Sequence, residues 1–250
     1  MTEGVIMKPS QKAWTAVLMI LLYCGCATNA PLDTLYYKTD ETAQTKNMLV
    51  LLRGRAGNHE IFEKEGMIED IKAGKLPFDI AAPDAHFGYY MGRTLVPRLR
   101  EDVIQPAKAK GYDKFWFVGF SMGGLGALMY TREFPDEVAG VCVVSPFLGY
   151  RSIIDEIEDA GGLLQWDPGE FDPQKDWQRM FWDWLKRSAD DPQLMGKVYL
   201  GYGTKDPFIK AHRLFEAILP DSHVFTAEGG HTPETMKAIW HEFLDEGVIR

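Results

Sequence analysis

One serine in this chain lies where a hydroxyl can become a nucleophile. Ser121 is the centre of Gly119-Phe120-Ser121-Met122-Gly123, which follows an apolar run and precedes a small-residue pattern typical of a helix. A serine on such a strand-to-helix turn has a strained backbone and an exposed hydroxyl, and the helix directs its free N–H groups to the same place. The alternative interpretation is a serine that only caps the helix.

A carboxylate and a histidine follow the serine in the order that acyl transfer can use. Asp206 comes after an apolar run over 197–202, directly before Pro207, and His231 comes after two glycines that follow the next strand. A serine nucleophile needs a base to take its proton, an acid to orient that base, and N–H donors for the oxyanion. Without its partners, Asp206 would be interpreted as a turn residue. The remaining histidines have weaker positions, in helical runs, at a strand start or before the serine.

The elements that must position these residues alternate along the chain. Apolar runs predict strands over 48–52, 78–82, 115–120, 138–144, 197–202 and 223–227. Between them, helical spacing predicts helices over 60–73, 95–107 and 122–132, and a last helix that begins at Thr232-Pro233. This order predicts an α/β fold with a mostly parallel sheet flanked by helices. The loops after its strands, and thus all three residues, then lie at the carboxyl edge of the sheet.

One connection is too long to be a simple loop. Residues 149–192 separate two strands and are rich in tryptophan and aspartate, with helices expected near 153–160 and 177–189. We interpret this segment as a small helical insertion that forms a cap or lid. Its four tryptophans, at positions 166, 177, 182 and 184, either roof a substrate pocket or pack in the core.

The chain from Met48 onward resembles the α/β-hydrolase superfamily, and within it small esterases and lysophospholipase-like or feruloyl-esterase-like enzymes. The resemblance implies Ser121 as nucleophile, Asp206 as acid and His231 as base. It also implies an oxyanion hole formed by the N–H groups of Met122 and Arg55.

The chain departs from that family at one position and leaves the pocket weakly defined. Many relatives have His-Gly where this chain has Arg53-Gly54. The arginines at 53 and 55 either steer an anionic acyl group or pair with surface carboxylates. Tyr89 and Tyr90, in the loop after the second predicted strand, and Phe147 are candidates for the pocket wall, with loop packing as the alternative for the tyrosines.

Composition limits the class of protein. The chain has 250 residues, 46% of them hydrophobic, and a net charge of −9, which suits one hydrolase domain over residues 30–250. The negative charge argues against a nucleic-acid partner, which would require a basic face. No Cys or His spacing suggests a metal site, and we expect no metal or organic cofactor. Cys142 is expected in a buried strand.

The first 25 residues have the pattern of a secretory signal. Lys8 and Lys12 precede an apolar run over 13–23, which is too short to span a bilayer. Tyr23-Cys24-Gly25-Cys26 resembles a bacterial lipobox, although Tyr23 replaces the usual aliphatic residue, and Cys26 would then carry the lipid. A plain cleaved signal and a retained anchor are the alternatives. We expect an exported protein, either in the bacterial envelope, lipid-anchored or periplasmic, or secreted.

Together these features predict a serine hydrolase that cleaves a small-molecule carboxylic ester through an acyl-enzyme intermediate. A thioesterase or acyltransferase uses the same parts and is the first alternative. The second is an envelope binding module with a hydrolase fold and no catalysis.

Overall fold

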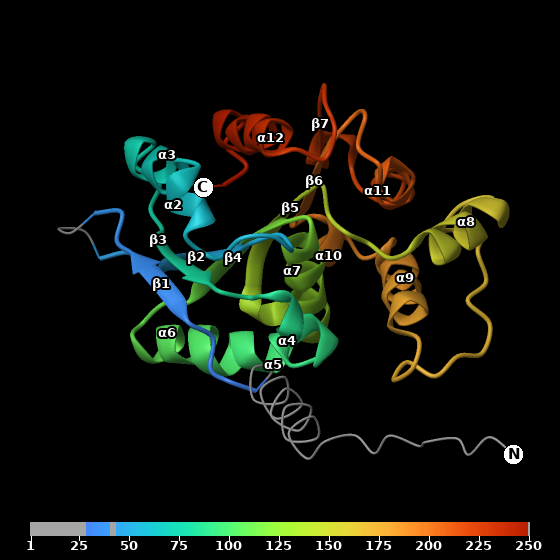
Figure 1. The fold of residues 1–250 in the computed structure, drawn as a ribbon, viewed down its shortest axis with the longest axis horizontal. Coiled ribbons are helices and arrows are strands. Elements are labelled where there is room, and N and C mark those ends of the chain that lie inside the picture. The colour runs from blue at the N-terminus through green and yellow to red at the C-terminus, as the bar shows by residue number, and fades with distance from the viewer. Residues whose placement is uncertain (1–28, 41–43, 250) are drawn as a thin grey trace, which may run out of the picture.

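In the part of the chain that the computed structural model describes, residues 29–40 and 44–249, seven strands form one sheet (Figure 1). Their order is β1-β3-β2-β4-β5-β6-β7, and every neighbouring pair is parallel except β1 with β3. The strands are β1 (Thr34–Tyr37), β2 (Asn47–Leu52), β3 (Asp79–Pro83), β4 (Lys114–Phe120), β5 (Val138–Val144), β6 (Val198–Gly203) and β7 (Val224–Ala227).

The six predicted strands are β2 to β7, each within about two residues of its expected bounds. The central strands have continuous apolar sequences because helices cover both faces of a parallel sheet. β1 was not expected from the sequence. It is a short edge strand, only half buried and antiparallel to β3, so it lacks the long apolar run that marks the others.

Helices cover both faces of the sheet and create two separate cores. One face packs against α2 (Ile61–Lys64), α3 (Met67–Ala73) and α12 (Pro233–Asp245). The other packs against α5 (Leu95–Arg98), the π-helical segment η1 (Leu99–Ile104), α6 (Gln105–Ala109), α7 (Met122–Glu133) and α11 (Ile209–Glu216). The predicted α/β architecture is therefore confirmed.

Two predicted helices differ in detail from those observed. The helix expected over 60–73 is two helices, because Gly66 has φ +80, a left-handed conformation that ends α2 before α3 begins. The helix expected over 95–107 is continuous but contains the π-helical turns of η1. The last helix begins as predicted: the Thr232 hydroxyl accepts a hydrogen bond from the Thr235 N–H, and Pro233 follows.

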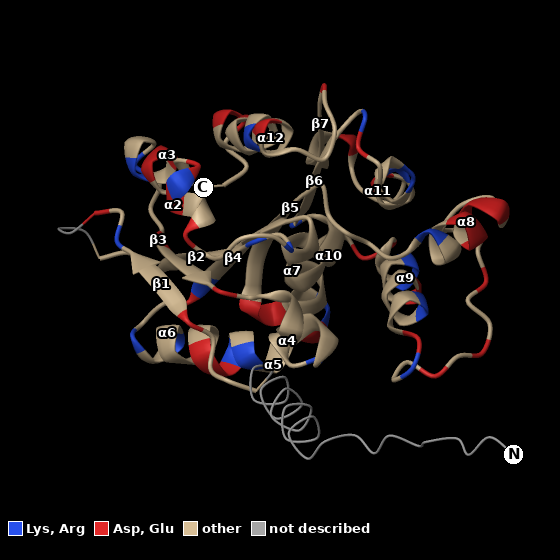
Figure 2. Cartoon of the chain, viewed as in Figure 1, with Lys and Arg blue, Asp and Glu red and all other residues tan. Residues whose placement is uncertain are grey.

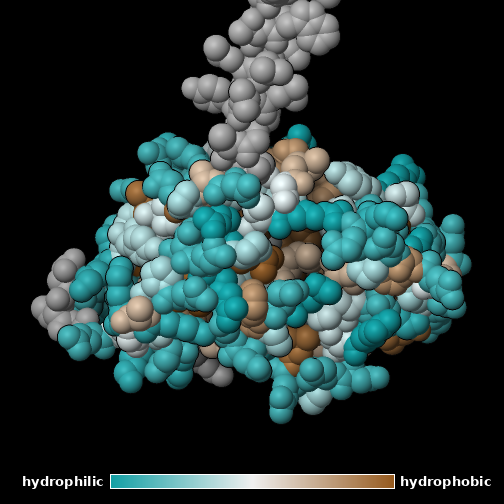
Figure 3. Space-filling view, turned by 90° about the horizontal axis from the view of Figure 1, so that it is seen from below, coloured by the Kyte–Doolittle hydropathy of each residue, from teal (hydrophilic) through white to brown (hydrophobic). Residues whose placement is uncertain are grey.

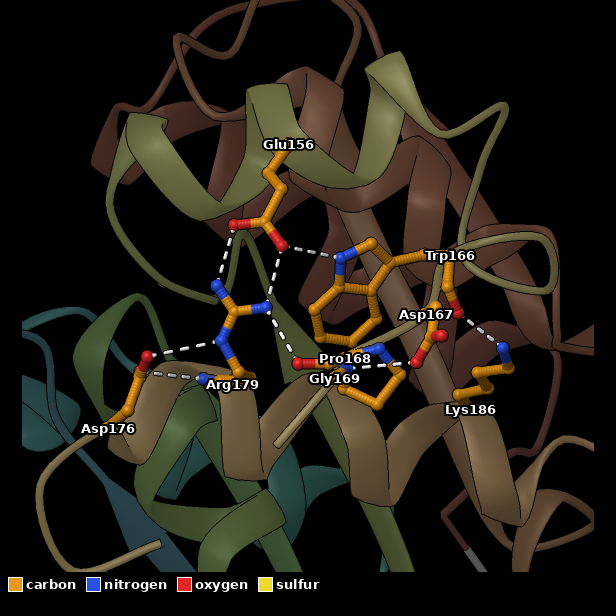
Figure 4. A network of polar contacts seen from close by, with 8 residues as sticks. All are labelled: Glu156, Trp166, Asp167, Pro168, Gly169, Asp176, Arg179 and Lys186. Atoms are coloured by element: carbon orange, nitrogen blue, oxygen red, sulfur yellow. Dashed lines mark hydrogen bonds and ion pairs between the residues drawn. The ribbon is translucent and has the colours of Figure 1, made fainter. Parts of the chain in front are cut away.

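Between β5 and β6 lie α8 (Arg151–Asp159), α9 (Trp177–Ser188) and α10 (Pro192–Met195). A network of polar side chains joins α8 to α9 (Figure 4). The Arg179 guanidinium donates to both oxygens of Glu156 at 2.6 and 2.7 Å, and the Trp166 indole N–H donates to the same carboxylate at 2.8 Å. We use the name insertion for residues 149–192 below.

Charged side chains of both signs are spread over the helices and loops, while the central strands carry few (Figure 2). The face seen in Figure 3 is mostly hydrophilic, and several of its hydrophobic residues lie recessed between hydrophilic ones. Among the described residues, no helix combines the length and the hydrophobicity that crossing a bilayer would take.

Candidate active site

Ser121 lies on a sharp turn between β4 and α7, at the carboxyl edge of the sheet. Its backbone has φ 51 and ψ −113, which is strained for a residue other than glycine. The turn is possible because glycines flank it: a Cβ on Gly123 would lie 2.0 Å from the Leu52 carbonyl oxygen, and one on Gly119 would lie 2.3 Å from that of Gly123. Ser121 occupies the N-cap position of α7, but its hydroxyl makes no capping bond to the helix.

The structure brings Ser121, His231 and Asp206 into one hydrogen-bonded row. His231 Nε2 lies 2.9 Å from the Ser121 hydroxyl oxygen, and His231 Nδ1 lies 2.9 Å from Asp206 Oδ2. Each residue follows a different strand: Ser121 follows β4, Asp206 follows β6 and His231 follows β7. The row depends on this topology, since 110 residues separate Ser121 from His231.

Asp206 is a buried carboxylate that is held from both sides. The residue is 2% exposed, and its Oδ1 accepts a hydrogen bond from the Phe208 N–H at 2.8 Å. Asp206 therefore also stabilises a turn, which was the alternative role considered for it. Burial by itself raises the pKa of Asp206, but the hydrogen bonds from His231 and Phe208 outweigh it and leave that pKa below its ordinary value. An ionised Asp206 accepts a hydrogen bond from the Nδ1–H of His231. This leaves Nε2 unprotonated, so it can accept the serine hydroxyl proton.

A second histidine, His212, lies within electrostatic reach of Asp206, and sequence reasoning did not assign it a place at the site. His212 is on α11, fully buried, and its Nε2 lies 2.9 Å from the Pro146 carbonyl oxygen. Burial lowers the pKa of His212 to about 4, although the Asp206 charge and the bond to Pro146 act in the opposite direction. His212 is therefore neutral at pH 7. Its position six residues after Asp206 was the only signal in the sequence.

The two expected oxyanion donors belong to segments that adjoin Ser121. Met122 is the first residue of α7, where the helix leaves its N–H groups without intrahelical acceptors. Arg55 belongs to the loop after β2, and Gly54 of that loop is so close that a Cβ on it would lie 3.5 Å from the Ser121 Cβ. In the described part of the chain neither Met122 nor Arg55 donates its N–H to an acceptor. We call residues 53–56 the oxyanion loop.

The arginines of the oxyanion loop lie in different environments. Arg53 is 3% exposed and pairs with Asp84, its Nε lying 2.6 Å from Asp84 Oδ1. Arg55 is exposed, and its guanidinium lies over the Phe87 ring, 4.8 Å from the centroid. Arg53 thus pairs with a carboxylate, which is one of the two alternatives, but the arginine of this pair is buried and only Asp84 is partly exposed.

A family model described as the alpha/beta hydrolase fold matches residues 47–179. The chain belongs to the α/β-hydrolase family. The match covers more than half of the chain and includes β2, the oxyanion loop, the turn at Ser121 and part of the insertion.

Solved structures of the same fold align over most of this α/β-hydrolase chain. The monoacylglycerol lipase of Paleococcus ferrophilus is 19% identical, with a TM-score of 0.55, over 88% of this chain and 99% of the lipase. The S-formylglutathione hydrolase of Staphylococcus aureus is 15% identical, with a TM-score of 0.56, over 88% and 96%. A ferulic acid esterase is also 15% identical, with a TM-score of 0.55, over 88% and 97%. At such identities the likeness shows the fold. A search of curated proteins gives no significant match.

In this hydrolase fold, aromatic rings from three separate segments gather beside His231. The Phe208 ring meets the His231 ring edge-on, with centroids 5.2 Å apart, and Phe147 packs against Phe208 at 5.7 Å. From the insertion, Trp177 of α9 lies 6.4 Å from Phe147 and Tyr150 lies 5.4 Å from it. Phe147 was expected at the pocket, whereas Phe208 and its contact with the base were not. We call Phe147, Trp177 and Phe208 the aromatic cluster.

The two tyrosines that were candidates for the pocket wall direct their hydroxyls into the protein. Tyr89 is 3% exposed, and its hydroxyl donates to the Ala30 carbonyl oxygen at 3.1 Å, so it packs under the segment before β1. Tyr90 is partly exposed, but its hydroxyl is buried against α7, where a Cβ on Gly126 would lie 2.7 Å from it. Their loop forms the helix α4 (Phe87–Met91), whose turns direct both hydroxyls inward.

Two cavities of about 690 and 550 Å³ lie away from this site. The larger is bounded by α9 and the loop over 169–173, the smaller by α10 and the end of α11, and neither is lined by Ser121, Asp206 or His231. In the described part of the chain no three His, Cys, Asp or Glu side chains form a metal-binding group. Cys142 is buried in β5 as expected, and Cys26 lies outside the described residues.

Proposed function

We propose that this protein is a serine hydrolase that cleaves small-molecule carboxylic esters through a Ser121–His231–Asp206 triad. The observation that carries the proposal is the unbroken hydrogen-bonded row from the Ser121 hydroxyl through His231 to a buried Asp206. The strained turn at Ser121 supports it, because such strain is retained where it exposes a functional group.

The geometry implies the course of the reaction. As the Ser121 oxygen attacks the ester carbonyl carbon, its proton passes to His231 Nε2, and Asp206 stabilises the imidazolium. The Met122 and Arg55 N–H groups stabilise the negative oxygen of the tetrahedral intermediate. His231 then returns the proton to the departing alcohol. Water then attacks the acyl-enzyme and gives a proton to His231, which passes it to the Ser121 oxygen as the carboxylic acid leaves.

The aromatic cluster supports a substrate with an apolar group next to the ester. One of its rings, Phe208, packs against His231, and the cluster combines a loop after β5, a loop after β6 and the insertion. We therefore propose that the insertion acts as a cap over this side of the site. We also retain the proposal, from the sequence alone, that residues 1–25 direct export and that Cys26 is the lipidation site.

Fluorophosphonate labelling tests the nucleophile. The wild-type protein should be modified on the peptide that carries Ser121, and Ser121→Ala should lose both this modification and ester hydrolysis while it keeps its circular dichroism spectrum. An unlabelled wild-type protein would support the binding module instead. A series of short p-nitrophenyl esters compared with acyl-CoA substrates separates ester hydrolysis from thioester hydrolysis, and added alcohols or amines reveal acyl transfer.

A further inference from the structure

The buried arginine at the start of the oxyanion loop holds that loop from beneath. Arg53 Nη1 donates to the carbonyl oxygens of Gly54 and Arg55 at 3.1 and 3.4 Å, while its Nε donates to Asp84. Asp84 directly follows β3, the strand that pairs with β2. A buried cation is costly unless it is paired and hydrogen-bonded, so the bonds of Arg53 favour one loop conformation over others.

The direction of the Gly54 carbonyl also determines the direction of the Arg55 N–H, because both belong to one peptide group. The described chain has no cis peptide bond, so the Gly54 carbonyl and the Arg55 N–H of the same planar group point in opposite directions. Because the Gly54 carbonyl points to a buried guanidinium, the Arg55 N–H points toward the accessible side of the loop. Ser121 adjoins this loop, since a Cβ built on Gly54 would lie 3.5 Å from the Ser121 Cβ.

We propose that Arg53, anchored by Asp84, is a positioning residue for the hydrolysis: it orients the Arg55 N–H toward the oxyanion. The inference rests on the proposed function, since it presupposes a reaction at Ser121. Arg53 touches neither the substrate nor the reacting atoms. Its positive charge also polarises the two peptide groups that it binds, which strengthens their N–H groups as donors when negative charge develops on the substrate.

The test compares Arg53→Gln, Arg53→Lys and Asp84→Asn with Arg100→Met as a matched control. Arg100 also pairs with a carboxylate, Glu137, at 3.2 Å, and its guanidinium lies over Phe134, at the end of α7 that is away from Ser121. For each variant, kcat and KM are measured on a short p-nitrophenyl ester, together with the rate constant for fluorophosphonate modification of Ser121.

The expected signature is a loss of kcat with little change in KM. Removal of a whole oxyanion donor costs about 10²–10³ in rate, so misplacing one should lower the kcat of Arg53→Gln about 10- to 100-fold. The fluorophosphonate rate constant should fall by a similar factor. Arg53→Lys should retain intermediate activity, because an ammonium group bonds one carbonyl but lacks the planar fork. Arg100→Met should stay within about 2-fold of wild type.

Two results would overturn the inference. One is a folded Arg53→Gln whose kcat stays within about 2-fold of wild type, and the other is a loss that Arg100→Met reproduces. If Arg53→Gln does not fold, Asp84→Asn and Arg53→Lys decide: each should lower kcat at least about 3-fold, and unchanged values in both would contradict the proposal. A wild-type protein that fluorophosphonate leaves unmodified at Ser121 would instead refute the proposed function itself.

Discussion

The turn at Ser121 and the insertion are each stabilised by a different kind of contact. At the turn, main chain lies directly against main chain: a Cβ on Gly123 would lie 2.0 Å from the Leu52 carbonyl oxygen, well inside van der Waals contact. In the insertion, the link between α8 and α9 runs through side chains, with Arg179 bound to Glu156, Asp176 and the Pro168 carbonyl (Figure 4). The side chains of Arg179 and Glu156 are 21% and 41% exposed, whereas Asp206 at the site is buried.

This difference has a physical consequence for how each region tolerates change. Backbone contacts leave no rotamer that can move aside, so a single added methyl group displaces a strand or a helix. Side-chain contacts that water can reach are weaker, depend on salt, and can rearrange. We therefore expect the hydroxyl of Ser121 to be rigidly placed. In the insertion we expect the polar contacts, and not the buried side chains of Phe181 and Trp182, to be the more adaptable part.

The largest effect should come from Gly123→Ala. The new Cβ would lie 2.0 Å from a backbone oxygen of β2, and we expect a loss of about 3 kcal/mol or more in the free energy of unfolding, with loss of activity. The matched change in the insertion is Gly169→Ala, where nothing lies within 4 Å and only the φ of +62 opposes a side chain. That variant should lose about 1 kcal/mol. Equal losses in urea unfolding would contradict the comparison.

Asp206→Asn should lower kcat strongly and leave the protein folded. An amide cannot hold the Nδ1–H tautomer or stabilise the imidazolium, and the same change in a well-known serine protease triad costs about 10⁴ in kcat. We expect a loss of about 10³–10⁴ here. Glu156→Gln, a carboxylate-to-amide change within the insertion, should keep kcat within about 3-fold. Steady-state kinetics on one ester measures both, and a larger effect from Glu156→Gln would reverse the assignment of roles.

Because His212 is buried, we expect the free energy of unfolding to depend on pH. This dependence arises at the site and not in the insertion. The pKa of His212 is about 4 in the folded protein and about 6.5 when unfolded, so below pH 6.5 the unfolded chain binds a proton that the folded state excludes. Stability should therefore fall as the pH falls from 6.5 to 4, by about 3 kcal/mol in total.

His212→Gln should remove this part of the acid sensitivity, as judged by urea unfolding at pH 7.5 and pH 5. His241→Gln is the control, because that side chain is nearly half exposed on α12. The insertion contains no histidine, so its rate of proteolysis from the folded state should not change through histidine protonation in this range. An unchanged pH dependence in His212→Gln would show that other groups cause it.

The smallest effect should come from Arg179→Met. The pair with Glu156 is bidentate but partly solvated, so we expect a loss of about 1 kcal/mol and faster proteolytic cleavage within 160–176. The value of kcat should not change. In 1 M salt the wild-type insertion should become more protease-sensitive as well, whereas Arg179→Met should respond less. A variant with unchanged cleavage would mean that aromatic packing alone joins α8 and α9.

The sheet and the order of Ser121, Asp206 and His231 could be predicted because each rests on a local signal. Apolar runs predict the strands, and parallel crossovers bring every strand-to-helix loop to one edge. The direction of the two tyrosine hydroxyls could not be predicted, because it depends on the short helix α4, for which the sequence has no clear cap or period. The edge strand β1 was missed because it is short and only half buried, so it lacks a long apolar run.

From its own residues the chain determines which groups reach the carboxyl edge, since a strand, a glycine turn and a helix are encoded over about fifteen consecutive positions. The tertiary structure alone decides what surrounds them: the bond from Arg53 to Asp84, the burial of His212 near the acid, and the ring beside His231. Those contacts join separate segments of the chain. Their geometry exists only after the sheet has ordered its strands and the helices have packed on it.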